Sequence, residues 1–226
     1  MKKFAIIGIF LVGFCLPISA HALTLMDENF TGATIYDSLT VNLKNNPANT
    51  SDDNLNKWID FPNSLRWGVT AAGGNTYAQH LVQTSDNTNL LFKAIDASGL
   101  GVGTVISGSF DYVASNRNGY FYFAGMLNGL NALDPYAPWF PPEDADDGTV
   151  LLKLTLTQTG DWTHVTYSYT LGQQFDALVF GFEMGGTTGF RGVDNVYAAA
   201  TVPEPSTLLL LGAGLIGLVG FRRMRK

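Results

Sequence analysis

Cysteine is almost absent from this chain of 226 residues, since the only one, Cys15, lies in an apolar run near the N-terminus. The rest of the sequence therefore has no disulfide and no cysteine nucleophile. Histidine is also scarce, and neither His80 nor His164 has a second His or a Cys at the spacing of metal ligands. Patterns for a nucleophile elbow, a zincin helix or a phosphate-binding loop are missing as well. The sequence thus presents no recognisable catalytic centre.

Basic residues are few in the central part of the chain. Between Leu23 and Thr201 there are seven of them against 18 acidic residues, a net charge of −11. A charge of this sign argues against nucleic acid, anionic lipid or anionic polymer as the main partner. It is compatible with divalent cations and with neutral sugars.

The N-terminus has the three parts of a secretory signal peptide. A positive start, Met1–Lys3, precedes an apolar core, Phe4–Leu16, and a small-x-small site at Ala20 and Ala22. We predict that residues 1–22 are removed by signal peptidase and that the mature chain begins at Leu23. A retained N-terminal anchor is the alternative.

The C-terminus also has three parts in order. A proline-punctuated motif occupies residues 202–206, an apolar run predicted to form a transmembrane helix occupies 207–221, and a basic tail occupies 222–226. This order is that of a membrane sorting signal. The run is shorter than the roughly 20 residues of a full span, so a permanent tail anchor and a buried core helix are alternatives. The motif residues are Val202, Pro203, Glu204 and Pro205, and the tail cations are Arg222, Arg223, Arg225 and Lys226.

The C-terminal arrangement resembles the PEP-CTERM sorting signal of Gram-negative bacteria, over residues 202–226 only. The resemblance implies recognition by exosortase, a membrane protease that cuts near the Pro-Glu-Pro motif. It also implies a transient stage in the inner membrane and then delivery to the cell surface or the exopolysaccharide matrix, often in biofilm-forming cells.

Residues 23–201 show the alternation of β-strands and no convincing helical period, so we predict one all-β ectodomain, an antiparallel two-sheet sandwich of jelly-roll type. One face of a strand is expected to carry Val150, Leu152, Leu154 and Leu156. Long loops are expected at 42–60 and 128–147. The predicted strands are 23–30, 65–70, 77–83, 89–95, 104–114, 120–127, 149–158, 162–171, 177–184 and 193–199.

The segments 162–169, 178–183 and 192–196 are similar to the closing strands of jelly-roll carbohydrate-binding modules. In that family an acid of the first strand and a late Asp can share a structural calcium ion. The resemblance implies Glu28 and Asp194 as ligands, with Asp27 less certain, and calcium does prefer six to eight hard oxygens. The alternative is that Asp194 and Asn195 make a turn or satisfy backbone groups.

Four aromatic residues, Trp58, Trp67, Tyr136 and Trp139, are predicted to lie in or near loops, where a ring can stack on a sugar. Trp162 is assigned instead to the core. Two hypotheses follow for the ectodomain: a non-catalytic module for carbohydrate binding or matrix structure, or a secreted glycan-cleaving enzyme with two acids about 5 to 9.5 Å apart. The acids show no catalytic spacing, so we favour the first. A third possibility is a permanently tail-anchored periplasmic protein.

Overall fold

The computed structural model describes residues 21–37, 56–61, 67–81, 90–115, 117–127, 148–184 and 190–202. They belong to one compact unit, Ala22–Val202, except for His21. Twelve strands form two six-stranded sheets, which confirms the predicted all-β sandwich. Within these ranges no helix is long and apolar enough to cross a bilayer. Residues 1–20 of the predicted signal peptide and the predicted helix 207–221 lie outside the described residues, whereas His21 and Ala22 belong to β1.

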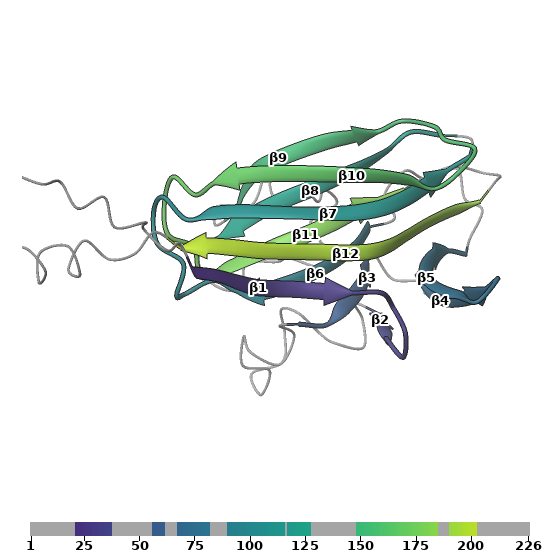
Figure 1. The fold of residues 1–226 in the computed structure, drawn as a ribbon, viewed down its shortest axis with the longest axis horizontal. Helices are drawn as coiled ribbons and strands as arrows, with labels where there is room; N and C mark the ends of the chain where they lie inside the picture. The colour runs from purple at the N-terminus through teal and green to yellow at the C-terminus, as the bar shows by residue number, and fades with distance from the viewer. Residues whose placement is uncertain are drawn as a thin grey trace, which may run out of the picture. The chain divides into compact units, whose positions relative to one another are not determined.

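The first sheet, called sheet A, is built around its longest strand, β12 (Arg191–Val202). One edge of β12 pairs with β7, and the other edge is shared by β5 and β1 (Figure 1). In Figure 1, β1 begins and β12 ends at the same end of the sheet. The other strands of sheet A are β10 (Thr163–Thr170), β7 (Val105–Ala114), β5 (Asn75–His80), β4 (Trp67–Ala72) and β1 (His21–Glu28).

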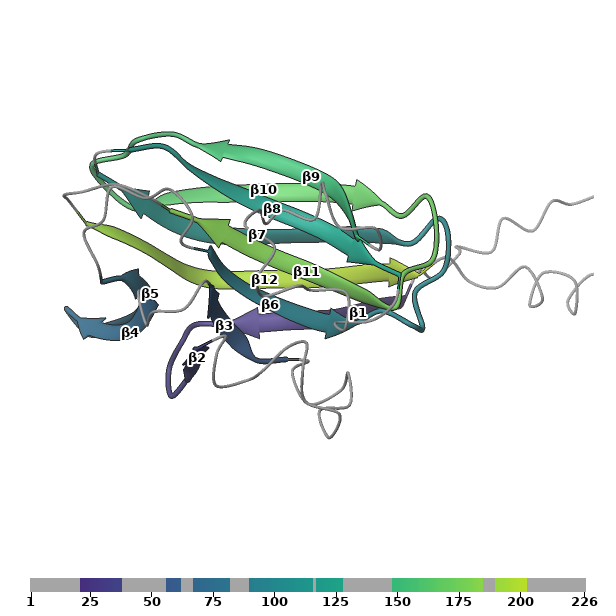
Figure 2. The same ribbon diagram turned by 180° about the vertical axis from the view of Figure 1, so that it is seen from behind.

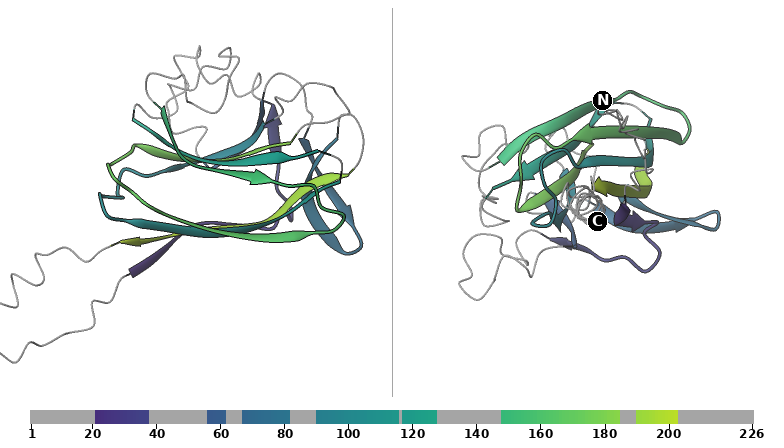
Figure 3. Two further views of the ribbon diagram at one scale, coloured as in Figure 1. Left: turned by 90° about the horizontal axis from the view of Figure 1, so that it is seen from above. Right: turned by 60° about the vertical axis from the view of Figure 1, so that its left-hand side comes forward.

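The second sheet, sheet B, covers one face of sheet A (Figures 2 and 3). All of its pairs are antiparallel except β2 with β3, which run parallel. Its strands, in spatial order, are β2 (Ile35–Asp37), β3 (Trp58–Phe61), β6 (Leu90–Asp96), β11 (Ala177–Glu183), β8 (Gly119–Met126) and β9 (Gly148–Leu156).

The ten predicted strands correspond to β1 and to β4 through β12, with shifts of a few residues at their ends. Two strands were missed. β2 has only three residues, and β3 lies inside the segment expected to be the loop 42–60, which corrects that prediction. Elements of three or four residues are too short to show alternation, so pairing with β6 rather than local pattern defines β3.

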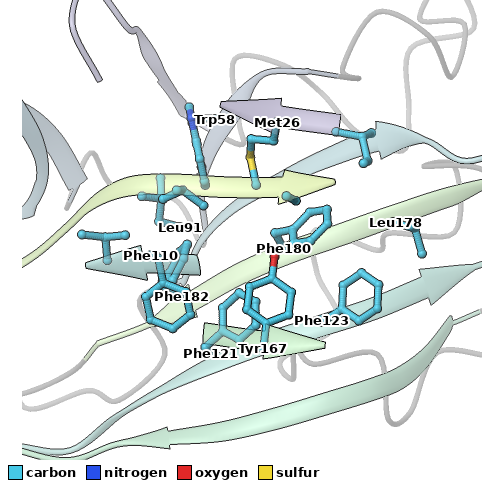
Figure 4. Close-up of a cluster of buried hydrophobic side chains, with 14 of the residues drawn as sticks. Met26, Trp58, Leu91, Phe110, Phe121, Phe123, Tyr167, Leu178, Phe180 and Phe182 are labelled. Carbon is cyan, nitrogen blue, oxygen red and sulfur yellow. The ribbon is translucent and has the colours of Figure 1, made fainter. Parts of the chain in front are cut away.

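The core between the sheets is rich in aromatic rings (Figure 4). Phe110 of sheet A lies with its ring centre 4.7 Å from that of Phe121 and 5.0 Å from that of Phe182, both in sheet B. Tyr167 packs on the same group, with its ring centre 4.9 Å from Phe121. These rings join the two sheets, because each large side chain buries apolar area against strands of the opposite layer.

A bulge in β9 corrects the predicted face of that strand. The register with β8 shifts between Phe123 and Ala124, whose partners are Leu152 and Val150. Leu151 is the extra residue, so Val150 contacts a second apolar cluster while Leu151 packs on the main core. Tertiary pairing thus breaks the two-residue period that the sequence suggested.

The second apolar cluster lies on the outer face of sheet B. Ile59, Phe92, Tyr122 and Val179 are all buried there, although their neighbours along each strand face the main core. Strands β6, β8 and β11 are therefore buried on both faces. This explains why their sequences are nearly continuous apolar runs.

Candidate functional site

Glu28, a predicted calcium ligand, is the last residue of β1, and its carboxylate binds N–H and ammonium groups of the protein. Its Oε1 accepts a hydrogen bond from the Phe30 backbone N–H at 2.9 Å. Its Oε2 accepts one from the Trp58 indole at 3.2 Å and lies 3.5 Å from the ammonium nitrogen of Lys93. That ammonium is also 5.5 Å from the centre of the Trp58 ring. Glu28 therefore ties the end of β1 to β3 and β6.

Trp58 and Trp67 lie in strands and in the core, which corrects their predicted position in or near loops. Only 2% of Trp58 and 1% of Trp67 is exposed. Trp58 packs on Phe30, with 5.2 Å between ring centres, and Trp67 packs edge-on against His80 at 5.4 Å. Rings buried to this degree offer no face for a sugar to stack on, so both leave the set of candidate binding residues.

Asp194, the second predicted calcium ligand, lies at a bulge in β12 and is 1% exposed. Its Oδ2 accepts a hydrogen bond from the Asn75 amide at 2.7 Å, and its Oδ1 accepts one from the Asn195 backbone N–H at 2.8 Å. Burial raises the pKa of this carboxyl; the two hydrogen bonds lower it, and the charge of Asp111 raises it further. The alternative expected for Asp194 and Asn195, satisfaction of local polar groups, matches this geometry.

The donor set around these two acids does not suit calcium. The ion needs six to eight oxygens, whereas the Glu28 oxygens face two N–H donors and an ammonium group. Across the part of the chain that the structure describes, no group of three or more His, Cys, Asp or Glu side chains could hold a metal ion.

A polar and aromatic cluster that the sequence reasoning missed lies at the margin of the outer face of sheet B. We call it the Tyr120 cluster; it consists of Tyr120, Tyr122, Lys153 and Glu183. Lys153 on β9 is exposed, with its ammonium 4.9 Å from the ring centre of Tyr120 and 5.1 Å from that of Tyr122. The Tyr122 hydroxyl donates to Glu183 Oε2 at 2.7 Å.

Glu183 is the electrostatically perturbed member of this cluster. Burial raises the pKa of its carboxyl, while the Tyr122 hydrogen bond and the nearby charges of Lys153 and Arg117 oppose the rise. The site therefore presents a half-buried tyrosine ring, a carboxyl group and an ammonium group side by side. The period-two pattern that puts Tyr120 and Tyr122 on one face of β8 was visible in the sequence, but pairing with Lys153 was not.

The remaining predicted residues lie outside the described ranges, apart from three. Ala22 and Asp27 are in β1, where Asp27 is exposed, and Val202 is the last residue of β12. Outside the ranges lie Ala20, Tyr136, Trp139, Pro203, Glu204, Pro205, Arg222, Arg223, Arg225 and Lys226.

The C-terminal resemblance is confirmed by a family model, the PEP-CTERM protein-sorting motif, which matches residues 201–226. The matched segment begins at Thr201, so it includes the last two residues of β12. The chain is therefore an exported protein whose β-sandwich ectodomain carries a membrane-directed sorting signal at its C-terminal end. No curated protein matches the chain.

Solved structures with a similar arrangement include carbohydrate-binding modules. A CBM4 structure is 18% identical, with 68% of this chain and 92% of that chain covered and a TM-score of 0.45. The CBM22-1 xylan-binding domain from Paenibacillus barcinonensis Xyn10C is 12% identical, with 81% of this chain and 98% of that chain covered and a TM-score of 0.44. The N-terminal cellulose-binding domain of Cellulomonas fimi β-1,4-glucanase C is 11% identical, with 62% of this chain and 86% of that chain covered and a TM-score of 0.42. Likeness this distant identifies neither a ligand nor an activity for this chain.

Proposed function

We propose that this protein is processed by exosortase near Pro203, Glu204 and Pro205 and is delivered to the cell surface or the extracellular polysaccharide. There its ectodomain acts as a non-catalytic polysaccharide-binding module of the matrix, such as that of a biofilm. The sorting motif supports the export route. The net charge of the ectodomain, −11, favours a neutral sugar polymer over an anionic one.

The observation that carries the binding proposal is the Tyr120 cluster. An aromatic ring can stack on the apolar face of a sugar, while a carboxylate accepts from hydroxyl groups and an ammonium group donates to them. Tyr120, Glu183 and Lys153 supply these three functions from three adjacent strands. Because strands rather than loops hold them, their geometry is fixed before a ligand arrives.

A glycan-cleaving activity is the competing hypothesis, and one pair of acids can be weighed directly. Asp111 and Asp194 are neighbours across β7 and β12. Asp194 is 1% exposed and both of its oxygens accept hydrogen bonds from protein groups, so it is poorly placed to reach a glycosidic oxygen. We accordingly place binding ahead of catalysis; release of reducing ends from a panel of polysaccharides would reverse that order.

The test is retention of the full chain in gels that contain a neutral polysaccharide, hydroxyethyl cellulose or galactomannan. Tyr120→Ala should migrate faster in the polysaccharide gel than the parent chain, with a dissociation constant raised about tenfold. Val102→Ala, a change of an exposed apolar residue in the turn between β6 and β7, is the control and should behave like the parent. Equal retention of Tyr120→Ala and the parent would remove the cluster from the proposal.

Tyr136 and Trp139 stay in the proposal as additional ligand residues, on the ground of their residue type alone. Trp139→Ala is the variant to compare with Tyr120→Ala in the same gels. Retention that falls in Trp139→Ala but not in Tyr120→Ala would move the proposed site to the segment 128–147.

A further inference from the structure

Trp162 lies on the outer face of sheet A, where 39% of it is exposed, so its assignment to the core is wrong. Its ring is supported by two others. It packs edge-on against Tyr77, 5.4 Å between centres, and against Phe190 at 6.2 Å, and those two rings are 5.5 Å apart. The three rings come from the start of β10, from β5 and from the residue before β12. The exposed Trp162 ring is thus held in place by two less exposed rings.

Gly192 on β12 allows this close packing. A Cβ atom at that position would lie 3.1 Å from the Cη2 atom of Trp162 and 3.3 Å from the Tyr77 ring. Because Gly192 has no side chain, the Trp162 indole packs directly against the β12 backbone. Because three separate elements position the ring, little conformational entropy remains to be lost when a ligand stacks on it.

A row of polar side chains follows Trp162 across the same face. His164 Nδ1 is 2.6 Å from Asp111 Oδ1, and the Asn195 amide donates to Asp111 Oδ2 at 2.7 Å. The bulge in β12 turns Asn195 to this face, because Val193 and Val196 on either side both pack in the core. Asn195 has a positive φ of 50°, a conformation that asparagine tolerates better than most residues.

Tyr197 stands beyond this row and is also 39% exposed. It pairs with Ser109 of β7, whereas Trp162 precedes the pair of Thr163 with Tyr112. The two exposed rings are therefore offset by about four residues along the strand direction, or roughly 13 Å at about 3.3 Å per residue, and they lie on either side of β7. The polar groups of the row lie between Trp162 and Tyr197. Two aromatic rings with hydrogen-bonding groups between them suit a polysaccharide strand, whose sugar rings carry hydroxyl groups at their edges.

We propose that this surface, the Trp162 face, is a second binding site, for a strand of neutral polysaccharide. Asp111 and Asp194 lie on the face or directly beneath it, and the strands β5, β7, β10 and β12 contain a single lysine or arginine, Arg191, which is buried. The basic side chain on the face, His164, already contacts Asp111. A uronic acid or phosphate polymer would therefore meet carboxylates and no lysine or arginine on these strands, which favours an uncharged polymer.

The Trp162 face and the Tyr120 cluster lie on the outer sides of opposite sheets, with the aromatic core between them. Both sites together make the sandwich a rigid link that holds two polysaccharide strands, one on each side. The inference rests on the proposed function for its ligand class, although the Trp162 face stands on its own contacts.

The experiment compares Trp162→Ala, Tyr120→Ala and the double variant of the full chain, recovered in the form that a Gram-negative host leaves it. Trp162→Ala should bind galactomannan or hydroxyethyl cellulose about tenfold more weakly in affinity gels, because the loss of one site removes the avidity of two, and the double variant should not be retained. Asp111→Asn, which keeps the size of the side chain, should also weaken binding and guards against a folding defect in the first variant. Alginate, an anionic polymer, should retain none of these proteins.

The experiment distinguishes failure of the Trp162 face from failure of the Tyr120 cluster. If Trp162→Ala and Asp111→Asn bind as the parent does while Tyr120→Ala does not, the second site is overturned and the proposed function stands. If neither single variant changes retention of a parent that binds, both sites are wrong. If the parent binds neither neutral polymer, the proposed function itself is lost. Aggregation of galactomannan by the parent, measured by light scattering, should disappear in either single variant, because a link needs both faces.

Discussion

Glu28 illustrates how one side chain can serve the fold while its sequence context suggests a metal. Its carboxylate satisfies the indole N–H of Trp58 and the backbone N–H of Phe30, a residue held at a φ of 58°. It also neutralises Lys93 in a partly buried setting. Bulky residues rarely adopt a positive φ, so the hydrogen bond to Phe30 stabilises a costly conformation.

Replacement of Glu28 by alanine should therefore destabilise the sandwich. Two N–H donors and one ammonium group would lose their partner, and we expect the free energy of unfolding in urea to fall by about 3 kcal/mol. Lys93→Met should lower the free energy of unfolding by less, because the Glu28 carboxylate still accepts from both N–H donors. The melting temperature of the parent should be the same in EDTA and in calcium; a clear rise with calcium would restore Glu28 and Asp194 as metal ligands.

Glu183 makes a prediction about pH. Its pKa is raised above the ordinary value of 4.5, mainly by burial, so the folded chain binds this proton more tightly than the unfolded chain. The stability that the protonated Glu183 contributes is fully present below its ordinary pKa of 4.5 and is lost as the pH rises through the raised pKa of the folded chain. Glu183→Gln cannot ionise, so its stability relative to the parent should increase between pH 4 and pH 7. Urea unfolding at both pH values tests this, and a constant difference would contradict it.

At the scale of the strand, β7 and β12 approach so closely that one position must be glycine. A Cβ atom on Gly108 would lie 2.3 Å from the Tyr197 carbonyl oxygen and 2.4 Å from the Tyr167 hydroxyl. The carbonyl oxygen belongs to the backbone of the neighbouring strand, so it cannot rotate away. Burial raises the pKa of the Tyr167 phenol, in keeping with its place inside the core.

Gly108→Ala should lower the free energy of unfolding by about 3 kcal/mol, the upper range for overpacking. Gly172→Ala is the matched control, because a Cβ atom there meets nothing within 4 Å. It should be neutral or slightly stabilising, since alanine restricts the unfolded chain. Similar losses for both variants in urea unfolding would argue against the close approach of β7 and β12.

At the scale of the whole ectodomain, the first and last strands are neighbours and their outer ends coincide (Figure 1). Trp162 lies at the opposite end of the sandwich, where β10 begins. The Trp162 face is therefore remote from the point at which the strands meet the sorting signals in the sequence.

Processing can be checked by the intact mass of the protein from membrane and extracellular fractions of a native Gram-negative host. We expect a chain that begins at Leu23 and ends near Pro205, because the signal peptide and the sorting signal flank the sandwich. Since Val202 belongs to β12 and packs on the core, the cut should lie beyond it. A membrane-bound chain that still ends at Lys226 would identify a permanent tail anchor.

Sequence alone determined the features that local chemistry encodes. The PEP-CTERM signal is linear, so its residue types can be identified without a fold. Alternation likewise located ten strands, because the two-residue period follows from strand geometry itself.

Only the tertiary structure decided where the aromatic rings lie. Trp162 was assigned to the core but is 39% exposed, whereas Trp58 and Trp67 were expected in or near loops and are buried. Burial of a tryptophan depends on the strands that pack around it, and those partners are distant in sequence. The bulges in β9 and β12, and the pairing of Lys153 with the Tyr120 ring, arise from register between strands for the same reason.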